Sequence, residues 1–217
     1  MKKIIIVGAG FAGLQAAKGL ANSSFEVIII DKHNYHLFQP LLYQVATAGL
    51  SPADIALPIR NIFPAQQNFK IILDELIEIN EKINKIKTKN NTYFYDYLIL
   101  ATGSVPSYFD YNEWKKFAPS LKNIEDATYI RAKILKTFEK AERIKDKKEL
   151  DKLMNFVLVG GGPTGVEMAG AIVELSKKVL SKEFANIDTK SAKIILLEAG
   201  SHILPSASKK LSIYAKK

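Results

Sequence analysis

The chain has 217 residues, and its 47% hydrophobic and 24% charged residues form an ordinary globular composition for one or two domains. It contains no cysteine, which excludes disulfide frameworks, thiolate metal sites, iron–sulfur ligation and dithiol redox mechanisms from these residues. The net charge of +9 comes from lysines scattered over many segments and predicts solvated faces. Because no RNA-recognition, zinc-finger or helix-turn-helix pattern is present, we expect no nucleic-acid partner.

The N-terminal segment predicts a strand, a glycine turn, a helix and a second strand. The β-branched run 4–7 leads directly into the motif G-x-G-x-x-G at Gly8, Gly10 and Gly13, and helix-forming residues follow. Such a turn lets backbone N–H groups and the positive end of a helix approach a pyrophosphate. The fingerprint also requires an acid at the end of the next strand, and Asp31 stands there. We therefore predict a dinucleotide-binding site.

The segment 32–52 is rich in aromatic residues, amides and turn formers and has no clean periodicity, which indicates a long structured loop. A short helix is expected near residues 52–61. His33 and His36 are close in sequence, but no third ligand stands at metal-binding spacing. We therefore expect no metal site, with one histidine in the loop and one packed inside.

Short β-rich segments follow between residues 69 and 95. They predict a small antiparallel meander, formed by 70–73, 76–79 and 85–88 with a turn at 89–92. A buried strand over 98–101 then ends in the small residues Ala101, Thr102 and Gly103, which allow the backbone to approach a ligand closely.

A second unit of the same kind follows an amphipathic helix predicted over 123–148. Its parts are, in order, the strand 156–159, the glycines Gly160, Gly162 and Gly165, a helix to about residue 180, the strand 193–197 and the acid Glu198. Pro163 suits the first turn of that helix, where its missing N–H is not needed. Two units of this kind predict two dinucleotides and electron transfer between them.

The expected fold class is therefore α/β. A Rossmann-like parallel sheet is led by residues 3–7 and joined by 27–30 and 98–101, with the meander attached. An incomplete second Rossmann-like unit follows.

The stretch Asn34–Thr47, NYHLFQPLLYQVAT, followed by Leu50-Ser51-Pro52 and Ile59-Arg60, resembles the signature of the type II NADH dehydrogenases. These are single-chain NADH:quinone oxidoreductases of the two-dinucleotide-binding-domain flavoprotein superfamily. The resemblance continues through Ala101-Thr102-Gly103, the second glycine motif and Leu197-Glu198-Ala199-Gly200, so it covers essentially the whole chain. It implies FAD on the first unit and NADH on the second.

The resemblance also implies roles for individual residues. Those implied to hold FAD are Gly8, Gly10, Phe11, Ala12 and Gly13 at the pyrophosphate, Asp31 with Lys32 at the adenosine ribose, Gln39 near the flavin, Leu76 beside the adenine, and Ala101, Thr102 and Gly103 as a second backbone wall. Those implied to hold NADH are Gly160, Gly162, Pro163, Thr164 and Gly165 at the pyrophosphate and Glu198 at the ribose. Glu167 would stand near the nicotinamide–flavin contact as the candidate catalytic acid or base, and an acid that favourably opposes the helix dipole is an equal interpretation.

Members of that family are much longer, and their later part includes the rest of the NADH domain, a second FAD motif, the quinone site and an amphipathic membrane anchor. We therefore expect an N-terminal portion of such an enzyme. An FAD-binding domain would span residues 1–110, and a truncated NADH-binding domain 111–217. By itself, this portion is expected not to sustain quinone turnover.

The function implied by the resemblance is hydride transfer from NADH to FAD and electron transfer onward to a membrane quinone. The full-length form is expected in the cytoplasm or peripherally on the inner face of the cytoplasmic membrane, and a homodimer is compatible with it. Two alternatives stay open. One is a catalytically inactive nucleotide-binding or scaffold remnant, and the other is a related FAD- and NAD-dependent reductase with a protein acceptor.

Overall fold

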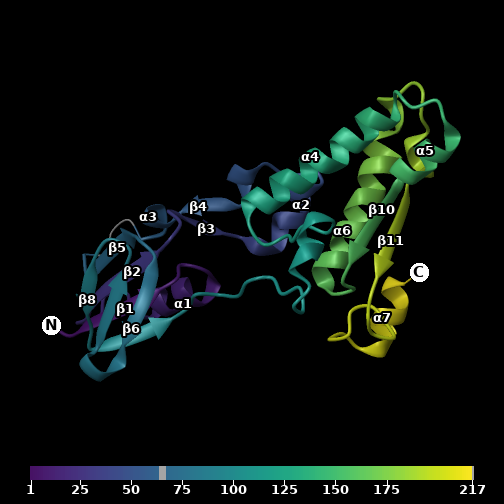
Figure 1. The fold of residues 1–217 in the computed structure, drawn as a ribbon. Helices are drawn as coiled ribbons and strands as arrows, with labels where there is room; N and C mark the ends of the chain where they lie inside the picture. Colours follow the sequence, from purple (N-terminus) through teal and green to yellow (C-terminus); the bar gives the residue numbers. More distant parts are fainter. Residues whose placement is uncertain (64–66, 217) are drawn as a thin grey trace. The chain divides into compact units, whose positions relative to one another are not determined.

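The computed structural model describes residues 1–63 and 67–216. The chain divides into two compact units, Met1–Phe38 with Ala53–Val105 and Gln39–Pro52 with Pro106–Lys217 (Figure 1). These units are defined by contacts within the chain and not by which nucleotide they bind. The expected FAD-binding domain over 1–110 and NADH-binding domain over 111–217 therefore stay predictions.

The first unit contains a four-stranded parallel sheet in the order β5-β2-β1-β9. Its strands are β1 (Lys3–Val7), β2 (Glu26–Asp31), β5 (Phe69–Leu73) and β9 (Tyr97–Leu100). The strands predicted to lead and join the sheet are therefore confirmed. Because all pairs are parallel, the carboxyl ends of the strands meet at one edge, where ligands bind in open α/β sheets.

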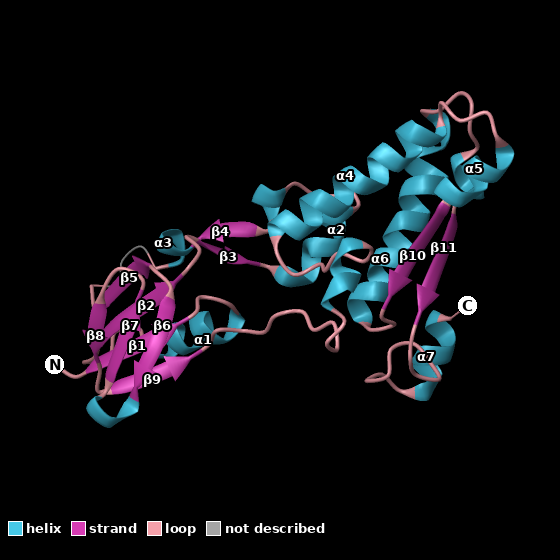
Figure 2. Ribbon diagram, viewed as in Figure 1, coloured by secondary structure: helices cyan, strands magenta, loops and turns pink. Residues whose placement is uncertain are grey.

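Both faces of this sheet are covered (Figure 2). Ile4 and Ile6 pack with residues of helix α1 (Phe11–Gly19) on one face. Ile5 and Val7 pack with Ile86 of the meander on the other. Since both faces are buried, the strand is a continuous apolar run without alternation.

The predicted meander begins later than expected. Its strands are β6 (Leu76–Asn80), β7 (Lys85–Thr88) and β8 (Thr92–Phe94), paired antiparallel in that order. The prediction that 70–73 belongs to it is wrong, because β5 pairs in parallel with β2. Ile71 packs with the core on one face and Ile72 with the core on the other, so this segment needs burial on both sides.

The segment expected to be a loop contains short regular elements. β3 (Tyr35–Leu37) pairs antiparallel with β4 (Ala56–Pro58), and the N–H of Phe38 donates to the carbonyl of Ile55 at 2.8 Å. The prediction of a short helix near 52–61 is therefore wrong for residues 56–58, which form β4. A 3₁₀ turn (Pro52–Asp54) precedes that strand and helix α3 (Ile59–Ile62) follows it.

In the second unit, the segment Gln39–Pro52 contains a 3₁₀ turn (Gln39–Leu41) and helix α2 (Leu42–Ala46), which packs on α4 and α6. The remaining helices are α4 (Ile124–Ala141), α5 (Lys147–Leu153), α6 (Pro163–Glu174) and α7 (Lys209–Ala215), and the strands are β10 (Asn155–Val159) and β11 (Lys193–Leu197). α6 continues through a π turn (Leu175–Val179) and a 3₁₀ turn (Leu180–Lys182), close to the predicted end.

The helix predicted over 123–148 is interrupted. Asn123 caps α4, where its side-chain oxygen accepts the N–H of Asp126 at 2.7 Å. Asp146 caps the separate helix α5 by accepting the N–H of Glu149 at 2.9 Å. A side chain that satisfies the first N–H groups of a new helix favours a break before it, which explains the interruption.

The two strands of the second unit pair in parallel, with Phe156 opposite Ile194, which confirms the second β-α-β unit. The ring of Phe138 on α4 stacks on Phe156 with centroids 5.2 Å apart. Exposed apolar side chains lie on the opposite face of this ribbon: Val157, Val159, Ile195 and Leu197. This sheet face is therefore open to solvent in the structure.

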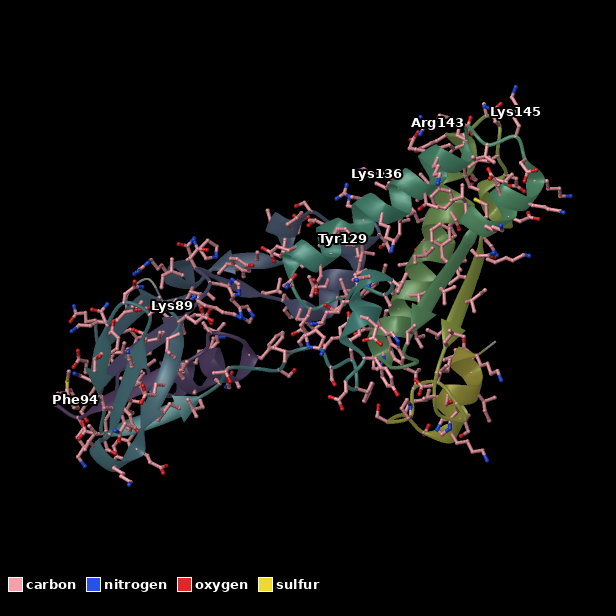
Figure 3. All side chains as sticks on the ribbon, in the orientation of Figure 1. Lys89, Phe94, Tyr129, Lys136, Arg143 and Lys145 are labelled. Atoms are coloured by element: carbon pink, nitrogen blue, oxygen red, sulfur yellow. The ribbon has the colours of Figure 1, made fainter. Side chains whose placement is uncertain are left out.

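Many of the basic side chains are exposed, as the charge pattern predicted. Figure 3 shows Lys136 on α4, and Arg143 and Lys145 after its C-terminal end, extending away from the ribbon. Within residues 1–63 and 67–216, every helix is too short or too polar to cross a lipid bilayer.

Candidate dinucleotide-binding sites

The first glycine turn joins β1 to α1. Gly8 has a φ of +101°, a conformation that glycine adopts without strain, and a Cβ there would overlap the carbonyl oxygen of Ala101. The N–H of Ala101 in turn donates to the carbonyl of Val7 at 2.8 Å. A Cβ on Gly13 would overlap the carbonyl oxygen of Gly8. Gly8 and Gly13 are therefore required by the fold of the turn itself.

Gly10 differs from both, because no atom beyond its own and those of its two chain neighbours lies within 4 Å of a Cβ placed on it. It is the N-cap residue of α1, no side chain caps the helix, and its first turn contains no acid. The first N–H groups of a helix have no partner within the helix, and they carry partial positive charge. The open space beside Gly10 thus fits the pyrophosphate of a dinucleotide.

Asp31 lies at the end of β2, where the sequence placed a ribose-binding acid. Its Oδ2 accepts the N–H of Ala9 at 2.5 Å, and its Oδ1 accepts the N–H of His33 at 2.7 Å. A carboxylate oxygen accepts more than one hydrogen bond, so both oxygens can still accept from a hydroxyl. Asp31 therefore links the glycine turn to the end of β2, and it can still accept the hydrogen bonds predicted from a ribose.

Two polar residues near this site were not singled out as site residues from the sequence. His36 is 8% exposed, and its Nδ1 lies 2.9 Å from the carbonyl oxygen of Ala9. Its ring makes an edge contact with Phe11, centroids 5.2 Å apart. The expectation of one packed histidine is confirmed, but the partner lies 27 residues away and nothing local identifies it.

The second is Asp74, which directly follows β5 and is 5% exposed. Its carboxylate accepts the Thr88 hydroxyl at 2.7 Å, the N–H of Glu75 at 2.8 Å and the Asn90 amide at 3.0 Å. Its own N–H donates to the carbonyl of Asp31 at 2.9 Å. Burial raises the pKa of Asp74, but these hydrogen bonds, led by that of Thr88, outweigh it and lower the pKa below its usual value.

The other residues expected at FAD are distributed as follows. Phe11 and Ala12 form the first turn of α1, and Lys32 is exposed next to Asp31. Leu76 begins β6 half-buried, and Ala101, Thr102 and Gly103 follow β9, with Gly103 at a φ of +73°. Gln39 begins a 3₁₀ turn in the second compact unit, and its place near the flavin stays a prediction.

The second glycine turn repeats the geometry of the first. Gly160 has a φ of +105°, and its N–H donates to the carbonyl of Leu197 at 2.8 Å, as that of Gly8 does to Ile30 at 2.8 Å. A Cβ on Gly165 would overlap the carbonyl oxygen of Gly160. The N-cap of α6 is Gly162, with no atom within 4 Å of a Cβ there and no acid in the first helical turn.

Glu198 takes the place of Asp31 in this second turn. Its Oε2 accepts the N–H of Gly161 at 2.5 Å, and its Oε1 accepts that of Gly200 at 2.8 Å. These bonds, that of Gly200 first, lower the pKa of Glu198 below its usual value and favour its charged form. The two acids therefore contact matching atoms of their turns.

The remaining expected residues lie on α6. Pro163 opens the helix as predicted, and Thr164 follows it, exposed. Glu167 lies further along the helix, also exposed, and its catalytic role stays a prediction. In residues 1–63 and 67–216, no group of three or more acidic or histidine side chains is arranged to hold a metal ion.

Parallel strands, glycine turns with uncapped helix N-termini and acids at the strand ends define an α/β protein with two dinucleotide-binding units. The sequence matches the pyridine nucleotide-disulphide oxidoreductase family over residues 2–217, and the chain belongs to this family. Because the chain has no cysteine, these residues do not supply the disulfide of the family's name.

Known relatives include type II enzymes. The chain is 42% identical to the type II NADH:quinone oxidoreductase NdhA of Mycobacterium tuberculosis over 99% of its own length and 47% of the relative. It is also 42% identical to the Ndh enzyme of that organism, over 96% and 46%. The resemblance to type II NADH dehydrogenases is thus confirmed, and the chain spans about half the length of the curated relatives it matches.

A solved structure supports the same relationship. The structure of NDH2 from Plasmodium falciparum in complex with NADH superposes with a TM-score of 0.89 at 29% identity, covering 99% of this chain and 45% of that one. The α/β fold with a partial second unit is therefore that of this group.

Proposed function

We propose that the chain is the nucleotide-binding part of a type II NADH:quinone oxidoreductase, with FAD on the first unit and NADH on the second. The observation that carries the proposal is the repeated site geometry: Asp31 and Glu198 each accept the N–H after the first motif glycine. Similarity to the type II NADH:quinone oxidoreductases supports NADH as one of the two nucleotides, as does a relative's structure in complex with NADH.

The residues present fit both nucleotides. Gly10 and Gly162 leave space that a Cβ would partly fill, next to helix N-termini without acids. Asp31 and Glu198 supply carboxylate oxygens for ribose hydroxyls. When bound, FAD would take a hydride from NADH and pass electrons to a quinone, while the chain binds and orients the nucleotides.

The proposal is tested by titrating the purified chain with FAD, followed by flavin fluorescence, and separately with NADH. We expect saturable binding of both, with Gly10→Ala weakening FAD alone and Gly162→Ala weakening NADH alone. Binding of neither nucleotide, or loss of both through one variant, would overturn the assignment.

The redox step is tested on FAD-loaded protein without oxygen. We expect NADH to bleach the visible flavin absorbance, with no sustained oxidation of NADH by a short-chain quinone. Binding without bleaching would favour a catalytically inactive nucleotide-binding protein. Restoration by an electron-carrier protein and not by quinone would favour the reductase alternative.

We also propose that the full-length form associates peripherally with the inner face of the cytoplasmic membrane, the alternative being a cytoplasmic location. The net charge of +9 and exposed cations such as Lys136, Arg143 and Lys145 favour an anionic lipid surface. Flotation with anionic vesicles, but not with neutral ones, is the expected result. Light scattering on the purified protein without vesicles tests whether it forms a homodimer.

A further inference from the structure

The backbone of Ala9 is held at both its N–H and its carbonyl oxygen. The N–H of Ala9 donates to Asp31 at 2.5 Å, and its carbonyl oxygen lies 2.9 Å from Nδ1 of His36. Because a carbonyl oxygen only accepts, Nδ1 must carry the proton in this contact. His36 is buried, and the T-shaped contact with Phe11 helps to fix the orientation of its ring.

This contact determines the direction of the next N–H. The peptide between Ala9 and Gly10 is trans, so its C=O and N–H point in opposite directions in one plane. When His36 holds the carbonyl on one side, the N–H of Gly10 is directed to the other. No atom lies within 4 Å of a Cβ placed on Gly10, so the turn has free space beside that residue.

The second unit repeats the arrangement with a different donor. The N–H of Leu204 donates to the carbonyl of Gly161 at 2.6 Å, which directs the N–H of Gly162 in the same way. Leu204 has a φ of +53°, a conformation unfavourable for a leucine. The loop is supported by the Ser212 hydroxyl, which donates to the carbonyl of Ile203 at 2.7 Å. The equivalent carbonyl of each turn, that of Ala9 and that of Gly161, is held by a different donor. This repetition indicates that the orientation of the carbonyl matters for the site.

We propose that His36 is a positioning residue for the pyrophosphate of FAD. It acts through the backbone: its Nδ1–H fixes the carbonyl of Ala9 so that the N–H of Gly10 is directed toward the phosphates before they bind. A donor already in place loses less conformational entropy on binding than one that must first be ordered. This inference rests on the proposed binding of FAD to the first unit.

The test compares three substitutions of His36. His36→Leu removes the donor and keeps an apolar side chain in the packed position. His36→Asn places an amide nitrogen close to the position of Nδ1, whereas His36→Gln places it close to that of Nε2. The matched control is His33→Leu, since the His33 ring packs near Tyr35, with centroids 5.3 Å apart.

We expect His36→Leu and His36→Gln to raise the Kd for FAD and for ADP about tenfold, the effect of one lost hydrogen bond. His36→Asn should stay within about threefold of the unchanged protein, as should His33→Leu. Adenosine, which lacks phosphates, should bind the variants and the unchanged protein equally, and so should NADH on the second unit.

Several outcomes overturn the inference. If His36→Leu weakens adenosine as much as ADP and also lowers the melting temperature without ligand, His36 only supports the fold. If the leucine variant does not fold, equal FAD binding by the asparagine and glutamine variants overturns the proposal. Failure of the unchanged chain to bind FAD would instead contradict the proposed function.

Discussion

Replacing Gly13 and Gly10 separately with alanine distinguishes glycines that the fold requires from a glycine that a ligand requires. A Cβ on Gly13 would come closer than 3.0 Å to the backbone oxygen of Gly8, a separation that real Cβ atoms do not show. The backbone cannot rotate away as a long side chain can. A Cβ on Gly10 meets nothing within 4 Å, and its φ of −73° suits alanine.

The expected magnitudes follow from these contacts. Gly13→Ala must push α1 away from the turn, an overpacking that costs about 3 kcal/mol, and the better helix propensity of alanine returns about 1 kcal/mol. The net loss of about 2 kcal/mol corresponds to a melting temperature about 10 °C lower for a unit of this size. Gly10→Ala loses a favourable N-cap residue but restricts the unfolded chain, so we expect a change within about 0.5 kcal/mol.

For FAD binding, in contrast to stability, the substitution of Gly10 should have a large effect. The methyl group of Gly10→Ala occupies the space proposed for the pyrophosphate, and each lost bond to a charged group is worth about 1.5–3 kcal/mol. The Kd for FAD should therefore rise about tenfold to a hundredfold or more, although the ligand-free protein is as stable as before. The assays are thermal unfolding without ligand and titration with FAD.

Gly19→Ala is the matched control, because Gly19 also lies in α1 and a Cβ there meets nothing within 4 Å. It should leave FAD binding unchanged and should not lower stability, because the better helix propensity of alanine, worth up to about 1 kcal/mol, is opposed by no overlap. Equal destabilisation by Gly13→Ala and Gly10→Ala would refute the reasoning. So would normal FAD binding by Gly10→Ala.

Three further predictions concern the second turn, the second acid and Asp74. Gly165→Ala should lower stability, because its Cβ overlaps backbone, whereas Gly162→Ala should leave stability unchanged. Gly162→Ala should instead raise the Kd for NADH at least about tenfold. Equal melting temperatures of the two variants would contradict this. Glu198→Gln should reduce the preference for NADH over NADPH about tenfold in a binding competition, because the carboxylate repels a 2′-phosphate and its amide does not; an unchanged ratio counts against the role of Glu198. Asp74→Ala should cost about 2 kcal/mol at neutral pH, since the buried Thr88 hydroxyl and two partly buried donors lose their acceptor. The folded-state pKa of Asp74 is lowered, so its contribution is present above the ordinary carboxyl pKa of 3.8 and is lost as the pH falls below it. Urea unfolding from pH 7 to pH 2.5 should show a smaller pH dependence in the variant, and an equal pH dependence in the two proteins would refute the assignment.

Features of this chain that depend on neighbouring residues were predictable, whereas features that depend on distant residues were less so. The glycine turns could be predicted because their information lies within a few residues: an apolar strand, glycines at fixed spacing and a helix. The ends of the strands at Asp31 and Glu198 are also local, since each acid directly follows an apolar run. The interruption between α4 and α5 was missed, although Asp146 belongs to a residue type that favours the N-cap position of a helix.

The pairing of segments was less predictable. Phe69–Leu73 reads as a short β-rich segment like those of the meander, and only its partner distinguishes it. β3 and β4 were missed because they lie about twenty residues apart and each is stable only when paired with the other. A strand has no stability of its own, so its neighbours decide its role.

By itself, the sequence determined that this chain has two dinucleotide-binding turns, which residues form them and which acids end their strands, because those features depend on backbone conformation over short distances. Only the tertiary structure decided which groups complete the sites. His36 reaches Ala9 across 27 residues, and Asp74 joins the end of β5 to Thr88 across 14 residues and, through its own N–H, to Asp31. Such contacts arise when the sheet brings the ends of its strands together, and no local pattern of residues encodes which side chains then meet.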